Sequence, residues 1–289
     1  MGVEEALNDR AVVTVAVGKD RYREQAVALA RSLRLIGDLT HRVLVTDQAE
    51  ADCHDVFDEI VTPPASVSPY LLKLEVPALV SRRRILFLDS DSLVFRRLDR
   101  IFALSEGASV AARGRWISDG EWYGELDENL PKIGLDRIPM INGGMIYFDR
   151  ELCGPVIEEA HRVAADYDST GLNKFRGKVP DEPCIAIAMA RAEGTRLLSD
   201  DLDTMNTGTG LIGRMKLRTD LNQCRYLQRT WKLRYKTPDV FHAADYVKFY
   251  PYWREIRRLE GFERNPGTDA PRFAKFDRWW CRMRYGRRW

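Results

Sequence analysis

Apolar residues in the first part of the chain form short continuous runs that alternate with spaced positions. Runs of β-branched and small apolar residues at 11–17 and 41–46 predict strands that are covered on both faces. Between these runs, Ala26, Leu29 and Leu33 recur at three- and four-residue spacing, which predicts an amphipathic helix. Strand, helix and strand in this order predict a parallel sheet with binding groups at the carboxyl ends of its strands.

The later segments continue this alternation. The stretch 107–139 is rich in Gly, Asp and Trp, which is typical of a loop over a binding site. The other predicted elements are strands at 59–61, 84–88, 145–148 and 240–242 and helices at 71–80 and 184–192. The pattern as a whole predicts an α/β domain.

Composition and charge narrow this picture. A chain of 289 residues with 45% hydrophobic and 30% charged residues is neither disordered, nor collagen-like, nor a disulfide-rich mini-protein. The net charge of +2 is unevenly distributed, because residues 271–289 hold seven Arg or Lys and one Asp. That local charge of +6 leaves −4 for residues 1–270, which predicts a mildly acidic body with a basic tail.

The sequence carries no signal that would place it outside the cytoplasm. No apolar run is long enough to span a bilayer, and the first residues are acidic, unlike an export signal. The five cysteines are scattered and form no Cys-x-x-Cys pair, which predicts buried free thiols. They are Cys53, Cys153, Cys184, Cys224 and Cys281.

The pattern Asp-x-Asp occurs at 89–91, 166–168 and 201–203, and the surroundings distinguish the three copies. Only Asp89 and Asp91 directly follow a predicted buried strand, on which side chains two residues apart share a face. Paired carboxylates favour Mg²⁺ or Mn²⁺, and such an ion neutralises a diphosphate leaving group. The alternative is a solvated acidic turn, which is also the interpretation of the other two copies.

His242 differs from the other three histidines because it ends a short apolar run and precedes Lys248 by six residues. An imidazole beside two carboxylates favours Mn²⁺ over Mg²⁺, and an ammonium group is a natural phosphate partner. A lone histidine is more often a structural residue.

Gly208–Gly213 fits the pattern Gly-x-Gly-x-x-Gly of dinucleotide-binding proteins. The residues before it, 200–207, are polar and predict no strand, so dinucleotide binding is not expected here.

Six segments, in this order along the chain, resemble the retaining GT-A-fold glycosyltransferases of family 8, which include glycogenin and bacterial lipopolysaccharide galactosyltransferases. The resemblance spans about Val12 to Tyr250. It implies one GT-A-like α/β domain over 1–265, with a mixed, mostly parallel central sheet flanked by helices. A basic, aromatic helical tail follows over 266–289. The six segments contain Tyr22, Lys73, Asp89 with Asp91, Asn142–Gly144, Asp181 with Glu182, and His242 with Lys248.

The resemblance assigns a role to each of these residues. Asp89, Asp91 and His242 correspond to ligands of Mn²⁺, with Mg²⁺ as the second choice. The motif that begins at His242 keeps the family's spacing to Lys248, a diphosphate contact, although Asp245 replaces a glycine. The remaining donor-binding positions are Val17, Asp20 and Tyr22 at the uridine, Lys73 near the donor, and Asn142, Gly143 and Gly144 beside the transferred sugar.

Asp181 and Glu182 correspond to the family's catalytic Asp-Gln pair. A carboxylate at Glu182, in place of a glutamine, is able to attack the anomeric carbon. Covalent catalysis by Glu182 is therefore one hypothesis. The family's favoured account is attack by the acceptor on the same face of the sugar, with the leaving diphosphate taking the acceptor's proton.

The tail has two chemically different sides on a helical wheel. Phe273, Phe276 and Trp280 share one side, and Lys275 and Arg278 lie opposite, as in an interfacial helix on an anionic membrane. Packing of the apolar side on the domain and binding of nucleic acid are the alternatives, and nucleic acid is the less favoured.

These observations predict a cytoplasmic, retaining, metal-dependent enzyme that transfers a hexose from a UDP-sugar, with peripheral membrane contact through 271–289. The acceptor is an unidentified hydroxyl of a glycan, a lipid-linked glycan or another molecule. A sugar nucleotidyltransferase is the alternative enzyme. The non-enzyme alternative is a membrane- or nucleic-acid-binding protein on a degenerate transferase fold.

Overall fold

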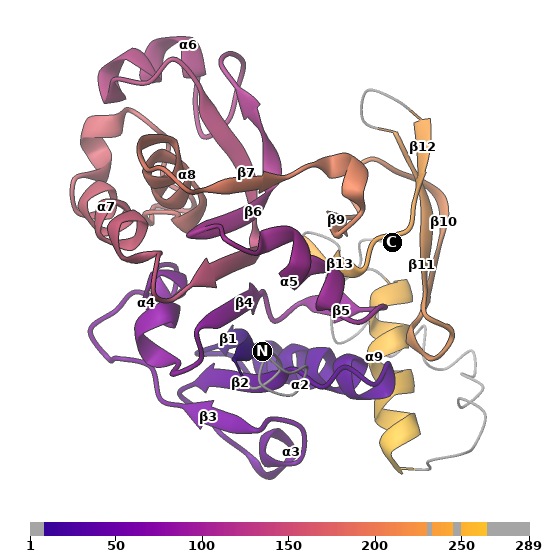
Figure 1. Ribbon diagram of the computed structural model, residues 1–289. Coiled ribbons are helices and arrows are strands. Elements are labelled where there is room, and N and C mark those ends of the chain that lie inside the picture. Colours follow the sequence, from indigo (N-terminus) through magenta and orange to yellow (C-terminus); the bar gives the residue numbers. More distant parts are fainter. Residues whose placement is uncertain (1–8, 230–232, 245–249, 265–289) are drawn as a thin grey trace.

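A seven-stranded sheet forms the centre of the computed structural model, which describes residues 9–229, 233–244 and 250–264 (Figure 1). The strands lie in the order β3-β2-β1-β4-β7-β6-β8. All pair in parallel except β7, which is antiparallel to both of its neighbours, so the predicted mixed, mostly parallel sheet is confirmed. The bounds are β1 Arg10–Ala16, β2 His41–Thr46, β3 Glu59–Val61, β4 Arg84–Leu88, β6 Val110–Ile117, β7 Ile138–Asp149 and β8 Arg196–Leu198.

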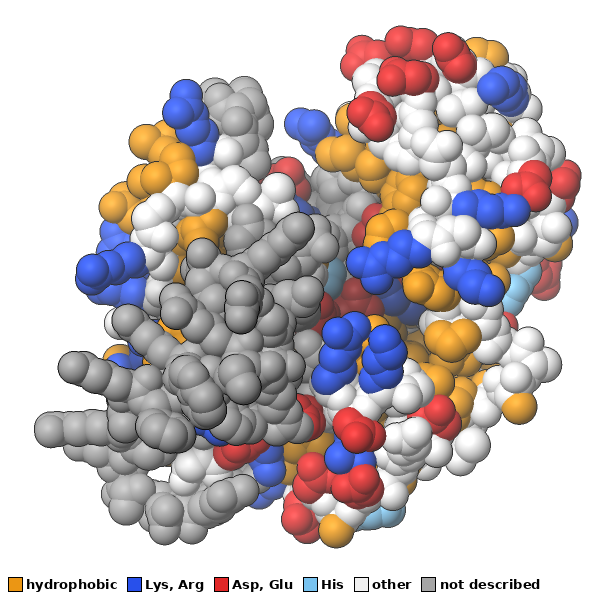
Figure 2. Space-filling view, turned by 180° about the vertical axis from the view of Figure 1, so that it is seen from behind, with side chains coloured by type: hydrophobic (Ala, Val, Ile, Leu, Met, Phe, Trp, Pro, Cys, Tyr) orange, Lys and Arg blue, Asp and Glu red, His pale blue; other side chains and the backbone are white. Residues whose placement is uncertain are grey.

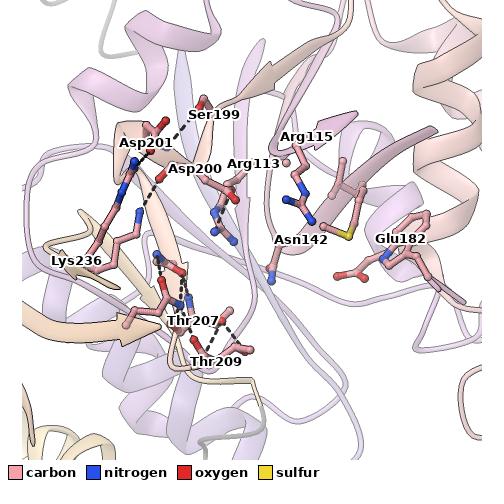
Figure 3. Close-up of a pocket in the computed structure, with 17 residues that line it drawn as sticks. Arg113, Arg115, Asn142, Glu182, Ser199, Asp200, Asp201, Thr207, Thr209 and Lys236 are labelled. Atoms are coloured by element: carbon pink, nitrogen blue, oxygen red, sulfur yellow. Dashed lines mark hydrogen bonds and ion pairs between the residues drawn. The ribbon is translucent and has the colours of Figure 1, made fainter. Parts of the chain in front are cut away.

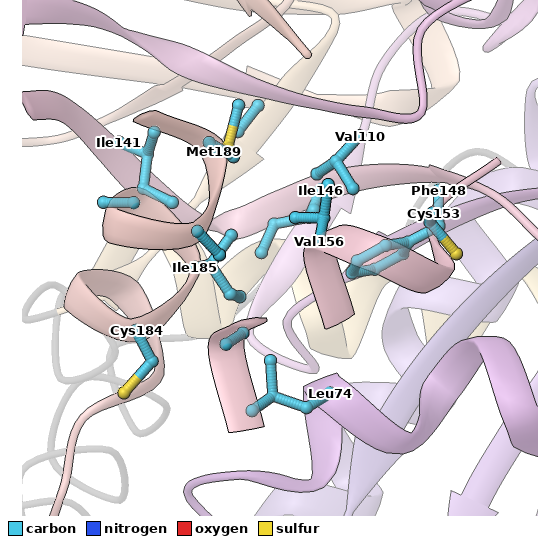
Figure 4. Close-up of a cluster of buried hydrophobic side chains, with 14 of the residues drawn as sticks. Leu74, Val110, Ile141, Ile146, Phe148, Cys153, Val156, Cys184, Ile185 and Met189 are labelled. Atoms are coloured by element: carbon cyan, nitrogen blue, oxygen red, sulfur yellow. The ribbon is translucent and has the colours of Figure 1, made fainter. Parts of the chain in front are cut away.

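Helices cover both faces of this sheet, because its strands carry buried apolar residues on both sides. Leu86 and Leu88 of β4 pack toward α2 and α5, whereas Ile85 and Phe87 pack toward α4, α7 and α8. Figure 4 shows part of the second cluster, in which Ile185 of α8 lies near Ile146 of β7. The helices are α2 Asp20–Leu35, α3 Ala51–His54, α4 Leu72–Leu79, α5 Asp99–Ser105, α6 Leu126–Asn129, α7 Gly154–Ala165 and α8 Asp181–Arg191.

Two smaller sheets and a last helix adjoin the central sheet at one end (Figure 1). One sheet has the order β5-β13-β9, and the other is the antiparallel meander β10-β11-β12. Helix α9, Tyr250–Arg264, packs Tyr252 and Trp253 against the meander. No helix in the described part of the chain is long and apolar enough to cross a membrane. The strands are β5 Ser92–Val94, β9 Met205–Thr207, β10 Leu211–Arg218, β11 Gln223–Arg229, β12 Leu233–Lys236 and β13 Val240–His242.

Several predicted elements coincide with the structure, and two predictions are wrong. The stretch 107–139 is not a loop throughout, since it contains β6, α6 and the start of β7. Residues 200–207 do contain a strand, β9, in which the side-chain amide of buried Asn206 is satisfied by a hydrogen bond to Gln228. The glycine pattern that follows leads into strand β10 rather than a helix, so dinucleotide binding still lacks its structural context.

Three further expectations concern the start of α8, the cysteines and the C-terminal tail. Helix α8 begins at Asp181, three residues before its predicted start, so Asp181 and Glu182 occupy its first turn. The four cysteines among the described residues are buried and free, as predicted. The tail 266–289 and Cys281 lie outside the described residues, and the domain limits 1–265 and 266–289 stay a prediction.

Candidate active site

Asp89, Asp91 and His242 meet where β4 ends and β5 begins. β13 pairs with β5 so that His242 lies opposite Ser92, the residue after Asp91. The Nε2 atom of His242 lies 3.2 Å from Asp91 Oδ1 and 3.4 Å from Asp89 Oδ2. One ligand atom from each of the three residues lies within 4.8 Å of the others. The chain thus brings together two carboxylates and an imidazole, as the sequence predicts.

Asn142 orients the imidazole of His242. Its Oδ1 accepts a hydrogen bond from the backbone N–H of Gly144, at 2.9 Å, and lies 3.0 Å from Nδ1 of His242. Because Oδ1 can only accept, Nδ1 carries a proton and Nε2 is the ring nitrogen that faces the two carboxylates. This outer contact, typical of metal-binding histidines, fixes the tautomer that binds a cation.

Burial and charge act in opposite directions on these groups. Burial raises the pKa of Asp89, against the effects of Lys73 and His242, which lower it. Burial lowers the pKa of His242, but the neighbouring Asp91 and Asp89 outweigh burial and raise it. Two half-buried carboxylates this close repel each other, so the cluster favours a cation between them.

Gly143 and Gly144 of β7 leave room for the groups that pack on them. A Cβ atom at Gly144 would overlap the ring of His242. A Cβ atom at Gly143 would lie 2.9 Å from Cγ of Glu182 and 3.1 Å from Nζ of Lys73. The two glycines are therefore needed for close approach, because neither has the positive φ that would otherwise demand glycine.

Lys73 of α4 joins the cluster to the first turn of α8. Its Nζ lies 2.5 Å from Asp181 Oδ2 and 3.2 Å from Asp89 Oδ1, and it donates to the carbonyl of Gly143 at 3.0 Å. Burial lowers the pKa of Lys73, but Asp181 and Asp89 outweigh burial and raise it. Lys73 is thus a fixed cation that separates the two carboxylates.

Glu182 is held by two hydrogen-bond donors. Its Oε1 accepts from the N–H of Gly143 at 2.7 Å, and its Oε2 accepts from the Tyr123 hydroxyl at 3.1 Å. Burial and the nearby Asp181 raise the pKa of Glu182. Sequence reasoning missed Tyr123, although it lies in the stretch predicted to cover a site. Its φ of 53° in the left-handed region is a second sign of a constrained position.

A cavity of about 480 Å³ lies beside Asn142 and Glu182. In Figure 3, Arg115 from above and Glu182 from the right point toward the space beside Asn142. Seen from behind, acidic side chains lie deep in the hollow of the surface, and Lys and Arg side chains lie at its rim (Figure 2). Most of the other lining residues come from β6, β7, β9, β11, β12 and the segment 199–201, and they include Arg113, Thr207, Gln228, Arg234 and Lys236.

Not every predicted donor residue reaches this cavity. Val17, Asp20 and Tyr22 follow β1, which pairs in parallel with β4, so they lie at the same edge of the sheet as Asp89. They do not line the cavity, and neither do Asp89, Asp91 and His242. Of the predicted site residues that the structure describes, Asn142 and Glu182 line it. Lys248 lies outside the described residues.

The comparisons with known proteins connect this geometry to a fold family. No protein-family model matches the sequence, and no curated protein matches it. Among solved structures, the galactosyltransferase LgtC in complex with donor and acceptor sugar analogs has a TM-score of 0.56 at 14% identity. The match covers 93% of this chain and 99% of LgtC. The chain has the GT-A glycosyltransferase fold.

Other GT-A structures match over smaller parts of their length. An active-site variant of LgtC, in which a glutamine is replaced by glutamate, has a TM-score of 0.55 at 14% identity over 87% of this chain and 95% of LgtC. The bifunctional glycosyltransferase WbbM has a TM-score of 0.51 at 18% identity over 70% of this chain. GlyE of Streptococcus pneumoniae TIGR4 has a TM-score of 0.48 at 16% identity over 68% of this chain. The chain spans 40% of WbbM and 46% of GlyE.

Proposed function

We propose that the protein is a retaining, metal-dependent glycosyltransferase that moves a hexose from a UDP-sugar to an acceptor hydroxyl. The observation that carries the proposal is the cluster of Asp89, Asp91 and His242 in a GT-A fold, with Asn142 in contact with His242 and lining the cavity. A donor set of two carboxylates and one imidazole suits Mn²⁺ and, less well, Mg²⁺. The bound ion would neutralise the negative charge on the leaving diphosphate.

The residues around the cluster supply the donor site in this proposal. Val17, Asp20 and Tyr22 hold the uridine at the edge of the sheet, and Lys248 contacts the diphosphate. Lys73 stays charged and fixes Asp181 and Asp89 at their separation. Beside the sugar lie Asn142, Gly143 and Gly144, whose compact backbone allows the hexose to approach Glu182.

The hydrogen bonds of Glu182 favour attack on the same face of the sugar over a covalent intermediate. Both carboxylate oxygens accept hydrogen bonds, which lowers their nucleophilicity. A fixed negative charge at this place stabilises the positive charge that develops at the anomeric carbon. The related variant of LgtC carries a glutamate in place of an active-site glutamine. By the family resemblance, Glu182 stands where the family has a glutamine, so this chain has a glutamate there naturally.

The acceptor enters through the cavity in this proposal. A volume of about 480 Å³ is in the range of small-molecule sites. Arg113 and Arg115 come from the stretch 107–139, which the sequence predicts to lie over a binding site. Four buried free cysteines support a reducing compartment, the cytoplasm.

One experiment tests the function before the acceptor is known. The protein is incubated with a panel of UDP-sugars and Mn²⁺, and slow hydrolysis of each donor is measured, with EDTA as the control. One donor is expected to be cleaved only with the metal, and Asp91→Ala is expected to abolish that cleavage. If UDP binds no more tightly with Mn²⁺ than with EDTA, the transferase proposal fails.

A further inference from the structure

The three strands of the meander β10–β12 contain no Asp or Glu. This composition is unusual in a chain whose 45 basic residues are almost balanced by 43 acidic ones. The meander is therefore a basic surface element. Its cations are Arg214, Lys216, Arg218, Arg225, Arg229, Arg234 and Lys236.

The two faces of the meander differ. On the inner face, Met215, Leu217 and Tyr226 are buried against α9 and β13. On the outer face the cations are exposed. Figure 2 shows blue and orange side chains, without red among them, along the left edge where the meander lies. The outer cations are Arg214, Lys216, Arg225 and Arg229.

These four outer cations have no carboxylate partner within the described ranges of the chain. The other three do: Lys236 pairs with Asp203 at 3.0 Å, and Arg218 and Arg234 pair with Asp220 and Asp201. Arg225 instead lies over the ring of Tyr235, 4.3 Å from its centroid. The outer face thus presents unneutralised positive charge.

Exposed apolar side chains lie between these cations. The pairing register places Ile212 opposite Leu227 and Leu227 opposite Tyr235, so the three form one row across the sheet. Ile212 is 40% exposed, Tyr235 61% and nearby Leu233 60%. Apolar side chains flanked by cations form the kind of surface that enters the headgroup region of an anionic bilayer.

We propose that the outer face of β10–β12 docks on a membrane surface that contains anionic lipids. Charge complementarity favours a negatively charged partner. The chain's own segment 271–289 cannot supply it, because that segment carries a net charge of +6. On this face Ile212 and Leu233 are exposed aliphatic groups, Leu227 is half-buried, and the aromatic ring of Tyr235 carries Arg225 over its face. A surface that binds single-stranded nucleic acid uses several aromatic rings on which successive bases stack, so the aliphatic groups favour lipid.

Docking by this face would hold the cavity close to the bilayer. Arg234 and Lys236 of β12 line the cavity, and the next residues of the same meander form the outer face. If the proposed transferase function holds, the acceptor is then a hydroxyl of a membrane-anchored molecule, such as a lipid-linked glycan. This step rests on the proposed function, whereas membrane docking does not.

Flotation of the full chain with vesicles tests the docking. Vesicles of phosphatidylcholine alone are compared with vesicles that also contain about 30 mol% of the anionic lipid phosphatidylglycerol. The test protein combines Arg214→Gln, Lys216→Gln and Arg229→Gln. We expect its partitioning to the anionic vesicles to fall at least tenfold, roughly the loss of the charge attraction of these three side chains.

A matched control removes the same charge elsewhere. The control protein combines Arg162→Gln, Arg176→Gln and Lys178→Gln, at positions on and after α7 in a different part of the surface. We expect this control to change partitioning to the anionic vesicles less than about twofold. Equal losses in both triple variants, or a loss in neither, would overturn the proposal. The tail 266–289 is present in every protein compared, so any vesicle binding by the tail is common to all of them and cancels in the comparison between variants.

A second variant distinguishes docking on lipid from binding of nucleic acid, and it is chosen so that the fold is not disturbed. Ile212→Ser with Leu233→Ser keeps every charge and alters only exposed side chains. We expect this variant to lose vesicle binding at high salt, where apolar contacts carry the interaction. Unchanged vesicle binding at high salt, or tighter binding to single-stranded DNA than to anionic vesicles, contradicts docking on lipid. Donor hydrolysis without vesicles reports separately on the transferase, so the two proposals fail independently.

Discussion

His242 Nδ1 lies 3.0 Å from Oδ1 of Asn142, and that same oxygen accepts the N–H of Gly144. One amide oxygen on β7 therefore fixes both the backbone of the strand at Gly144 and the tautomer of the histidine on β13. Residues 100 positions apart in the sequence are coupled at the proposed metal site.

The first prediction removes this contact. Asn142→Ala is expected to weaken the Mn²⁺-dependent binding of UDP by about 10- to 100-fold, because outer contacts of metal ligands contribute on that scale. Isothermal titration of UDP with and without Mn²⁺ measures the effect. Asn142 also faces the donor sugar in the proposed site, so UDP without a sugar is the correct ligand for this test.

The control for this variant is its metal-free protein. If the affinity for UDP in EDTA falls as much as the affinity in Mn²⁺, Asn142 acts on the nucleotide and its positioning role for His242 is rejected.

The second prediction concerns Gly144. Gly144→Ala places a methyl group into the space of the His242 ring, so we expect Mn²⁺-dependent donor hydrolysis to fall by more than tenfold. Gly154→Ala is the matched control, because a Cβ atom there meets nothing within 4 Å at the start of α7. It should leave hydrolysis unchanged. Equal activity of the two variants would show that His242 has freedom to move without loss of function.

The sequence predicts most of the central sheet because its strands are uninterrupted apolar runs. The predicted bounds of the strands 41–46, 84–88 and 240–242 agree with β2, β4 and β13. The sequence pattern did not predict strands β6 and β9, and each has a physical reason. In β6, Arg113, Gly114 and Arg115 interrupt the apolar run, and Arg115 and Trp116 are exposed. β9 buries polar side chains, and Asn206 among them is hydrogen-bonded to Gln228 of β11, a strand later in the chain.

The candidate site was predictable to a similar degree. Asp89 and Asp91 can be identified from the sequence because they directly follow a buried strand. His242 can be identified because it ends one. Tyr123 was not predicted, since its role depends on a bend that carries it to Glu182. The cations of the meander follow no recognised motif, and their shared outer face depends on the pairing register of three strands.

The third prediction is a pH dependence of stability. The hydrogen bonds from Arg218, with the charge of Arg258 on α9, outweigh burial and hold the pKa of Asp220 below its ordinary value. A carboxyl whose pKa is lower in the folded state stabilises the protein fully above its unfolded pKa of about 3.9, and this contribution is lost as the pH falls from there through the lower pKa of the folded state.

Asp220→Asn should therefore cost on the order of 1 kcal/mol of unfolding free energy near pH 7 and much less near pH 3. Urea unfolding across this pH range measures the difference. Asp168→Asn is the comparison, because Asp168 is 81% exposed and pairs with Lys174 at the surface. The explanation fails if the cost of Asp220→Asn is the same at both pH values.

The fourth prediction distinguishes the two accounts of retention. If Glu182 were a covalent nucleophile, Glu182→Gln would abolish transfer, because an amide oxygen is a poor nucleophile. We expect instead that the variant keeps transfer within roughly tenfold of the natural protein, the loss of one favourable charge at the anomeric carbon. Tyr123→Phe removes one hydrogen bond from the same carboxylate and should have a smaller effect.

Mass spectrometry during turnover completes this test. A hexose adduct on the peptide that contains Glu182, formed and consumed at the rate of transfer, would establish the covalent route and reject same-face attack. Both variants leave Lys73, Asp181 and the metal cluster in place, so the affinity for UDP with Mn²⁺ should not change. A change in that affinity would mean that Glu182 positions Gly143 through its 2.7 Å hydrogen bond, and then the rate alone would not report on its chemistry.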